Sequence, residues 1–335
     1  MISKLVHLSY KNPIINDDFP DPRVIEVKGQ GYFAYGTHDE FSPTINNILL
    51  RHSWDLIHWS EAEGALLKLP VWAKHCKKFW CPHVALVSEE FRLYYAAEPD
   101  TKDGMCLALA TSNDTRNFID CGHPIAQKRG STFELLDPCF FIDPISKKHL
   151  LFYGSAHEPI RVVELASDGQ TFITSPKNIL LPGETTYHKL REGAYVTYNE
   201  KWKRYFLWVS GDNTWASCSY AVSVFWSESA IGEFEKIPGD HVVLKANDHW
   251  DSPGHNCIIK DTNHSEWIIY HAVDVKDRFI PGTDRFLRKM CIDEVLYTED
   301  GWPYINTRSP SYSVKNGPAV RYDAVKNYSS NTGFS

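Results

Sequence analysis

Four side chains that can transfer protons open four of five similar phrases in this sequence. Asp21, Asp137 and Glu192 carry carboxyl groups and His255 carries an imidazole, and each stands just before a short apolar run. Hydrolysis of a glycosidic bond needs one carboxylic acid to protonate the leaving oxygen and one carboxylate that activates water or attacks carbon. The residue types therefore suit an acid and base pair, and the fold must bring them together.

The five phrases share one form, which indicates an internal repeat. They start at residues 21, 81, 137, 192 and 255 and read DPRVIEVKGQGYFAYGT, CPHVALVSEEFRLYYAA, DPCFFIDPISKKHLLFYGS, EGAYVTYNEKWKRYFLWVS and HNCIIKDTNHSEWIIYHA. The successive intervals are 60, 56, 55 and 63 residues, and such periods are typical of repeat architectures. A polar or small residue, an apolar run, a polar turn and an aromatic run follow one another in each phrase, which is the pattern of a β-hairpin.

A second, weaker strand pair follows each hairpin, for example NILLRHSWDLIHWS after the first and CLALATSNDTRNFI after the second. Four antiparallel strands in each of five units predict an all-β protein, a five-bladed β-propeller with its active site at the central funnel. We interpret residues 1–335 as a single catalytic domain whose blades start near 21, 81, 137, 192 and 255. Residues 307–335 would supply a closing strand and a tail.

In a propeller the first strand of each blade lies closest to the axis, so the opening residues should face one funnel. Those residues are Asp21, Cys81, Asp137, Glu192 and His255. Asp21 on blade 1 and Glu192 on blade 4 are not neighbours in a ring of five, and a separation of roughly 6.5–9.5 Å would imply inversion of the anomeric carbon. Asp137, on the blade beside Glu192, should keep that carboxyl protonated by charge repulsion.

The alternative to a catalytic role is a structural one, because an aspartate before a proline commonly begins a strand or a turn. We assign that role to Asp143, which precedes Pro144. Asp21 and Asp137 differ from Asp143 because they share a repeat position with Glu192 and His255.

Other side chains are candidates for binding a sugar, whose ring has an apolar face and a rim of hydroxyls. Phe19 and Trp80 lie just before the residues that open the first and second phrases, and both could stack on the ring. His255 could hydrogen-bond substrate or bind a cation through a ring nitrogen. The remaining candidates are His83, expected to point into the funnel, Arg288, expected to open the second strand pair of blade 5, and Trp215 and Trp250, expected in rim loops.

Charge and hydropathy exclude two classes of partner. The chain has 35 basic and 42 acidic residues and a net charge of −7, without a basic stripe, which argues against nucleic acid. No run approaches the roughly 20 apolar residues of a membrane-spanning helix. The start MISKLVHLSYKNPI lacks the apolar core of a secretion signal, so we expect a cytoplasmic protein, with secretion after removal of a leader as the alternative.

The eight cysteines show no CxxC spacing, which argues against a structural zinc site. Cys81, Cys139, Cys257 and Cys291 lie in apolar, strand-like runs. We therefore expect buried, reduced thiols.

Between Pro13 and Asn306 the sequence resembles glycoside hydrolase family 43, the five-bladed-propeller arabinofuranosidases, arabinanases and xylosidases. The motifs that carry the resemblance are FPDPRVI, FWCPHVALV followed by RLYYAAE, LLDPCFFID, REGAYV, GHNCII and RKMCIDEVLYTEDGWPYI. Cys81 is a departure, because the family more often has alanine there.

The resemblance implies an inverting hydrolase in which Asp21 matches the general base, Asp137 the acid that tunes and orients its partner, and Glu192 the general acid. His255 matches a histidine at the base of the funnel that in some members holds calcium or its waters. Arg288 resembles an arginine that contacts the sugar in the deepest subsite. No cofactor is required by this interpretation, and a structural calcium ion at the funnel is the one possible addition.

The substrate expected from the resemblance is an oligosaccharide or polysaccharide that contains arabinose or xylose. We expect cleavage of α-L-arabinofuranosidic linkages, with a β-D-xylosidase or an endo-arabinanase as the alternatives. A retaining fructan enzyme would need an NDPNG-like phrase, and a phosphorylase would need a basic cluster beside the acid; the sequence has neither. A glycan-binding propeller without activity would be expected to lose at least one of the three acids.

Overall fold

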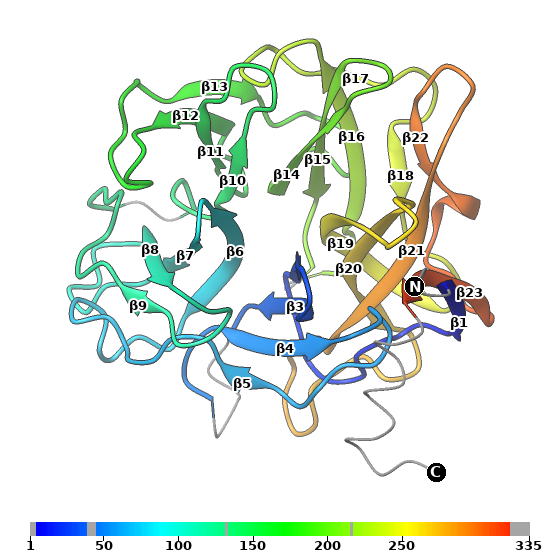
Figure 1. Cartoon of the computed structure of the whole chain (residues 1–335), viewed down its shortest axis with the longest axis horizontal. Coiled ribbons are helices and arrows are strands. Elements are labelled where there is room, and N and C mark those ends of the chain that lie inside the picture. Colours follow the sequence, from blue (N-terminus) through cyan, green and yellow to red (C-terminus); the bar gives the residue numbers. More distant parts are fainter. Residues whose placement is uncertain (1–4, 39–44, 131–132, 215–216, 322–335) are drawn as a thin grey trace.

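The apolar runs of the five repeats form the inner strands of five antiparallel sheets. A computed structural model describes residues 5–38, 45–130, 133–214 and 217–321, and it confirms the five-bladed β-propeller. The sheets stand around a common centre and follow one another clockwise in Figure 1. Within the described ranges the single helical element is the 3₁₀ turn η1 (Asn306–Arg308), and no helix there has the length and apolar character needed to cross a membrane.

Each blade is built from consecutive strands. Blade 1 contains β2 (Arg23–Val27), β3 (Gly31–Gly36), β4 (Leu49–Ser53) and β5 (Glu63–Gly64). Blade 2 contains β6 (Phe79–Val87), β7 (Glu90–Ala97), β8 (Cys106–Ser112) and β9 (Ile119–Asp120). Blade 3 contains β10 (Cys139–Ile142), β11 (His149–Tyr153), β12 (Ile160–Leu165) and β13 (Lys177–Leu180).

Blade 4 differs from the others in having an additional strand. It contains β14 (Glu192–Asn199), β15 (Arg204–Gly211), β16 (Ala221–Ser227) and β17 (Glu235–Lys236), with β18 (Val242–Leu244) also pairing with β16. Blade 5 contains β19 (Trp250–Lys260), β20 (Glu266–Asp274), β21 (Arg288–Tyr297) and β22 (Pro303–Ile305). The first strands contact one another in a closed ring, β2 with β6, β6 with β10, β10 with β14, β14 with β19, and β19 with β2.

Hydrophobic clusters fill the interfaces between neighbouring blades. Blades 1 and 2, for example, share a cluster that includes Tyr35, Phe79 and Tyr95, all fully buried. Four further clusters join the remaining neighbours, including blades 5 and 1. Burying one large apolar side chain contributes about 1.5–3 kcal/mol, so these clusters hold the blades, and the side chains on their inner strands, in fixed relative positions.

The N-terminal segment connects the last blade to the first. β1 (Leu5–Tyr10) pairs with β23 (Lys315–Arg321) in a separate two-stranded sheet. Farther along the same segment, the N–H groups of Ile14 and Phe19 donate to the carbonyls of Met290 and Arg288, at 2.9 Å each. The chain therefore runs along β21 of blade 5 before it enters blade 1.

The residues that open the inner strands share an unusual backbone conformation. Asp21, Cys81, Asp137 and His255 have φ between 51° and 57°, in the left-handed region. Few residues other than glycine adopt this region, at a cost of roughly 1–2 kcal/mol each. In blade 4 the residue at positive φ is Gly193 (φ 63°). The structure therefore corrects the alignment of the five phrases, because Glu192 stands one residue before the equivalent position.

Candidate active site

A cavity of about 420 Å³ opens at the centre of the propeller. The structure brings Asp21, Asp137, Glu192 and His255 together on its wall, as the repeat predicted. They arrive there from four different blades. The wall also includes Trp80, Cys81, Phe133, Thr214, Arg285 and Arg288.

Asp21 is buried in a shell of donors and positive charge. Its Oδ2 accepts a hydrogen bond from Thr37 Oγ1 at 2.5 Å, and its Oδ1 lies 3.2 Å from His255 Nδ1 and 3.7 Å from a guanidinium nitrogen of Arg288. Burial alone would raise the pKa of Asp21, but His255, Arg288 and His271 together hold this pKa well below its usual value. Asp21 is therefore a carboxylate at neutral pH, as a general base must be.

Glu192 has the opposite protonation behaviour. Its Oε1 accepts a hydrogen bond from the Tyr220 hydroxyl at 2.7 Å, and its Oε2 accepts one from Ser155 Oγ at 2.8 Å. Burial is the largest cause, and the charge of Asp137 the next, of a rise in the pKa of Glu192 to about 8. The predicted effect of Asp137 is present, but desolvation exceeds it. Glu192 thus keeps its proton near neutral pH, as a general acid must.

The pKa of Asp137 lies between those of Asp21 and Glu192. Oδ2 of Asp137 accepts the backbone N–H of Gly193 at 2.7 Å, which connects blade 3 to blade 4 directly beside Glu192. Burial raises the pKa of Asp137 to about 6, and the charge of Asp21 adds to the rise. One oxygen from each of Asp137 and Glu192, with a ring nitrogen of His255, lie within 4.8 Å of one another. Asp137 is therefore close enough to control the proton on Glu192.

Replacing Asp137 by Asn should move the alkaline limb of the rate profile to lower pH. The negative charge of Asp137 raises the pKa of Glu192, so the neutral amide should lower it, by about one unit or more. Asn also tolerates positive φ and can still accept the Gly193 N–H. The measurement is kcat/KM against pH for both proteins.

Asp143 provides the matched control for this pH profile. Its carboxylate accepts hydrogen bonds from the backbone N–H groups of Ile145 and Ser146 in the turn after β10, which confirms its assignment to a hairpin turn. Asp143→Asn should leave the alkaline limb where it is. An unchanged or higher limb in Asp137→Asn would contradict the role given to Asp137.

His255 presents an unpaired nitrogen in the funnel. Burial first, opposed by the charge of Asp21, lowers the pKa of His255 to about 3, so the ring is neutral. A neutral ring whose Nδ1 lies 3.2 Å from the Asp21 carboxylate carries its proton on Nδ1. Its Nε2 is then an acceptor, and it has no hydrogen-bond partner among the described residues.

This lone pair fits the calcium ion implied by the resemblance only through water. Ca²⁺ takes six to eight oxygen ligands, and His255 offers one nitrogen. The nearby oxygens belong to the three acids, of which Asp21 is already engaged by Thr37 and His255. A hydrated ion whose waters donate to His255 Nε2 is compatible with the site.

Two of the predicted binding residues line the cavity. Trp80, half-buried in β6, packs against a small cluster with Ala96, Met105 and Leu136 and leaves part of its surface on the cavity wall. Arg288 begins β21, as expected, and also lines the wall. Trp215 lies outside the described residues.

Three predicted binding residues do not reach the cavity. Phe19 is fully buried against Gly36, where a Cβ would come within 3.1 Å of its ring. His83 is buried beside Tyr195, because a register shift between Trp80 and His83 resets the alternation of β6. Trp250 belongs to a strand and a core cluster, since β19 continues through the polar sequence that was expected to form a loop.

The residues that open the inner strands form a first ring around the cavity. A second ring of side chains, which we did not predict, holds this first ring in place. The backbone N–H of Asp21 donates to His271 Nδ1 at 3.1 Å, that of Cys81 to Thr37 Oγ1 at 2.8 Å, and that of His255 to Ser210 Oγ at 2.7 Å. Thr37 directly follows the second strand of the preceding blade, and Ser210 and His271 lie in the C-terminal half of such a strand. Tyr220 was also missed; it stacks on His271 at 5.7 Å between ring centroids and bonds Glu192.

The signal for this second ring was present in the sequence. The aromatic runs of the five phrases end in YGT, YAA, YGS, VS and YHA, and Thr37, Ser155, Ser210 and His271 come from these endings. Tyr220 had no comparable signal, because it lies in a loop outside the repeated phrase. Together the two rings place a carboxylate of low pKa and a carboxyl of raised pKa in one pocket, which suits acid and base catalysis on a bound substrate.

Comparison with known proteins relates most of the chain to a single family. The family model for glycosyl hydrolases family 43 matches residues 10–303. A probable arabinan endo-1,5-alpha-L-arabinosidase A from Aspergillus flavus is 26% identical over 241 residues, covering 68% of this chain and 73% of that protein. A probable arabinan endo-1,5-alpha-L-arabinosidase D from Emericella nidulans is 24% identical over 327 residues, covering 87% of this chain and 80% of that protein.

Solved structures show the same fold. The crystal structure of a thermostable family-43 glycoside hydrolase superposes with a TM-score of 0.76 at 24% sequence identity, covering 92% of this chain and 99% of that chain.

Proposed function

The chain belongs to glycosyl hydrolase family 43, and we propose that, within this family, it hydrolyses α-L-arabinofuranosidic linkages of arabinose-containing oligosaccharides with inversion. The two curated relatives, named as arabinan endo-1,5-alpha-L-arabinosidases, support arabinose as the sugar. The observation that carries the mechanism is the opposite displacement of two pKa values in one cavity, downward for Asp21 and upward for Glu192.

In the proposed reaction Asp21 removes a proton from a water molecule as the water oxygen attacks the anomeric carbon. Glu192 donates its proton to the glycosidic oxygen as the bond from that oxygen to the anomeric carbon breaks. Attack from the face opposite the leaving group inverts the configuration. Asp21 ends protonated and Glu192 ionised, and exchange with solvent restores both.

The other cavity residues would orient the sugar. The ring of Trp80 provides an apolar face for stacking, the guanidinium of Arg288 provides donors for hydroxyl groups, and Nε2 of His255 provides an acceptor. A hydrated calcium ion at His255 would add positive charge at the base of the funnel, which favours the ionised form of Asp21.

The substrate proposal is tested by comparing aryl α-L-arabinofuranoside with aryl β-D-xyloside at equal concentrations. We expect the arabinofuranoside to give the larger kcat/KM. A preference for the xyloside would move the assignment to the β-xylosidases of the same family. Release of product from within a long arabinan chain, read from product lengths, would identify endo action.

A further inference from the structure

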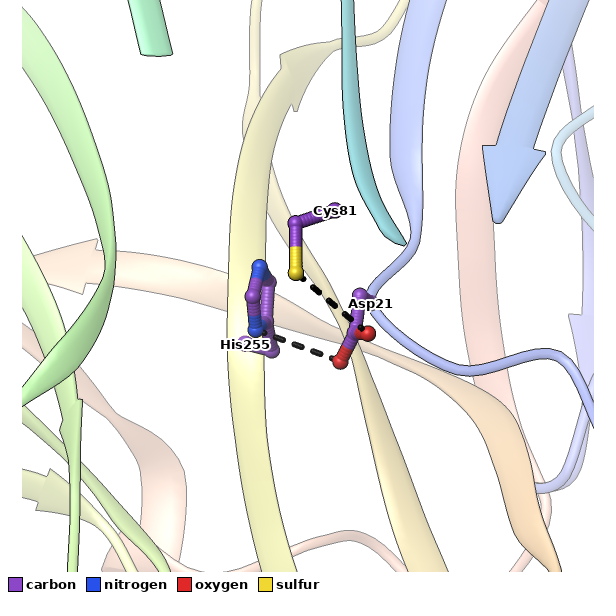
Figure 2. Close-up of side chains that lie close together, drawn as sticks. All are labelled: Asp21, Cys81 and His255. Atoms are coloured by element: carbon purple, nitrogen blue, oxygen red, sulfur yellow. Dashed lines mark hydrogen bonds and ion pairs between the residues drawn. The ribbon is translucent and has the colours of Figure 1, made fainter. Parts of the chain in front are cut away.

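Cys81 introduces a thiol into the funnel next to two groups that bind metals. Its Sγ lies 3.8 Å from Asp21 Oδ2, and His255 Nδ1 lies 3.2 Å from Asp21 Oδ1. One ligand atom from each of the three side chains falls within 4.8 Å of the other two. Figure 2 shows the three side chains pointing toward one another.

We propose that Asp21, Cys81 and His255 form a binding site for Zn²⁺ in the funnel, and that zinc bound there inhibits hydrolysis reversibly. The inhibition rests on the proposed role of Asp21 as general base, whereas the binding of the metal does not. A thiolate, an imidazole and a carboxylate are the three kinds of ligand that zinc takes in proteins, and three protein ligands leave a fourth position for water.

The distances are close to those that zinc requires. With bonds of about 2.0–2.3 Å, the ligand atoms of a tetrahedral site lie about 3.3–3.8 Å apart. The separation of 3.2 Å from His255 Nδ1 to Asp21 Oδ1 is just below this range, and that of 3.8 Å from Cys81 Sγ to Asp21 Oδ2 is at its upper end. Because one ligand atom of each residue lies within 4.8 Å of the other two, closing the site around a single carboxylate oxygen requires shifts of up to about 1 Å. Rotation of the Cys81 side chain can supply a movement of this size.

The site is accessible and its charges favour a cation. All three side chains line the open cavity, so the metal has an entry path. Asp137 lies within 4.8 Å of His255 and adds negative potential, while Arg288, 3.7 Å from Asp21, opposes it. His255 Nε2, on a side chain only 2% exposed, has no partner in the described part of the chain.

Binding requires the loss of one proton and the movement of another, because the proton of His255 must shift from Nδ1, which lies 3.2 Å from Asp21, to the unpartnered Nε2. Cys81 gives up its thiol proton to solvent as the Zn–S bond forms, and neither sulfur nor metal changes oxidation state. Asp21 bound to zinc can no longer accept a proton from water, so activity should stop while the metal is bound. A chelator should restore it.

The other cluster in the funnel has different chemistry. Asp137, Glu192 and His255 offer carboxylate oxygens and one nitrogen, a set without a thiolate. Inhibition by zinc, with weaker or no inhibition by Mg²⁺ and Ca²⁺, would therefore identify the thiol-containing group, because hard cations prefer oxygen ligands.

The test uses Co²⁺ as a spectroscopic substitute for zinc, with Cys81→Ala and Cys81→Ser as variants. We expect wild-type protein to bind one Co²⁺ and to show a charge-transfer band from thiolate to cobalt. The band should disappear when Zn²⁺ displaces Co²⁺, and both variants should lack it. The zinc concentration for half inhibition, relative to each protein's own metal-free rate, should rise at least about tenfold in both variants. Cys121→Ala and Cys218→Ala, which remove the two cysteines that are not fully buried, should behave like wild type.

Two outcomes would overturn the proposal. One is a charge-transfer band that persists in the Cys81 variants and disappears in the Cys121 or Cys218 variant, which would mean adventitious binding only. The other is equal zinc inhibition of wild type and Cys81→Ala. If the protein failed to hydrolyse arabinofuranosides, the cobalt spectrum would still decide whether the metal site exists.

Discussion

Glu192→Gln is expected to lower kcat/KM on arabino-oligosaccharides by about 10³-fold, within the range of about 10²–10⁴ typical of general acid catalysis. Glu192 is the one acid of the three whose pKa is raised as far as about 8, so it is the group that carries a proton at neutral pH. The amide of Gln can still bond Tyr220 and Ser155, which hold the wild-type carboxyl at 2.7 and 2.8 Å. The loss should therefore reflect the missing proton and not a rearranged site.

The leaving group provides the internal control for this variant. An aryl arabinofuranoside whose phenol is strongly acidic can depart without protonation, so Glu192→Gln should lose far less activity on it than on an oligosaccharide. Equal losses on both substrates would contradict the assignment of Glu192 as general acid. The measurement is kcat/KM for the two substrates with each protein.

Asp21→Asn is expected to lower kcat/KM by about 10³–10⁴-fold whatever the leaving group. The attacking water needs a base, and Asp21 is the acid whose pKa is held below its usual value. Asn is the matched replacement because Asp21 has φ 55°, a conformation that Asn tolerates. The fold should survive, which thermal unfolding can verify.

Added azide distinguishes a missing base from a damaged site. Azide needs no deprotonation, so it should restore bond cleavage in Asp21→Asn on the activated aryl substrate and give a glycosyl azide. The same anion should have little effect on the wild type. Near-wild-type hydrolysis by Asp21→Asn, or no rescue in a folded variant, would argue against this role.

The sequence was sufficient for the fold and for the convergence of the acids because both depend on the repeat. Hairpin phrases at a regular period predict blades, and blades around an axis place Asp21, Asp137 and Glu192 in one funnel. The prediction for blade 4 was wrong by one residue because it matched Glu192 to the aspartates by its carboxyl group. The backbone aligns Gly193 with the aspartates, since a left-handed conformation, and not a carboxyl group, is what the position requires.

Contacts between blades could not be predicted in the same way. Asp21 is held by Thr37 from its own blade and by His271 from blade 5, a pairing that only the closed ring creates. Local irregularities also defeated simple alternation. The register shift in β6 turned His83 away from the cavity, and β19 extended through Trp250 in sequence typical of a loop.

The cysteine spacing illustrates the same limit. The absence of CxxC argues against a structural zinc site with local ligand spacing, and the site proposed in the funnel has no local spacing at all. Its members, Asp21, Cys81 and His255, come from three blades. Ligands that come from different blades are brought together only by the fold, so they leave no motif in the sequence.

The most direct test of the account is the configuration of the first sugar released, followed by proton NMR during hydrolysis of an aryl α-L-arabinofuranoside. Water activated by Asp21 on the face opposite the oxygen protonated by Glu192 must give the β anomer first, with the α anomer appearing only by mutarotation. If the α anomer appeared first, the reaction would proceed through a covalent intermediate, and the roles assigned to the two carboxyl groups would be wrong.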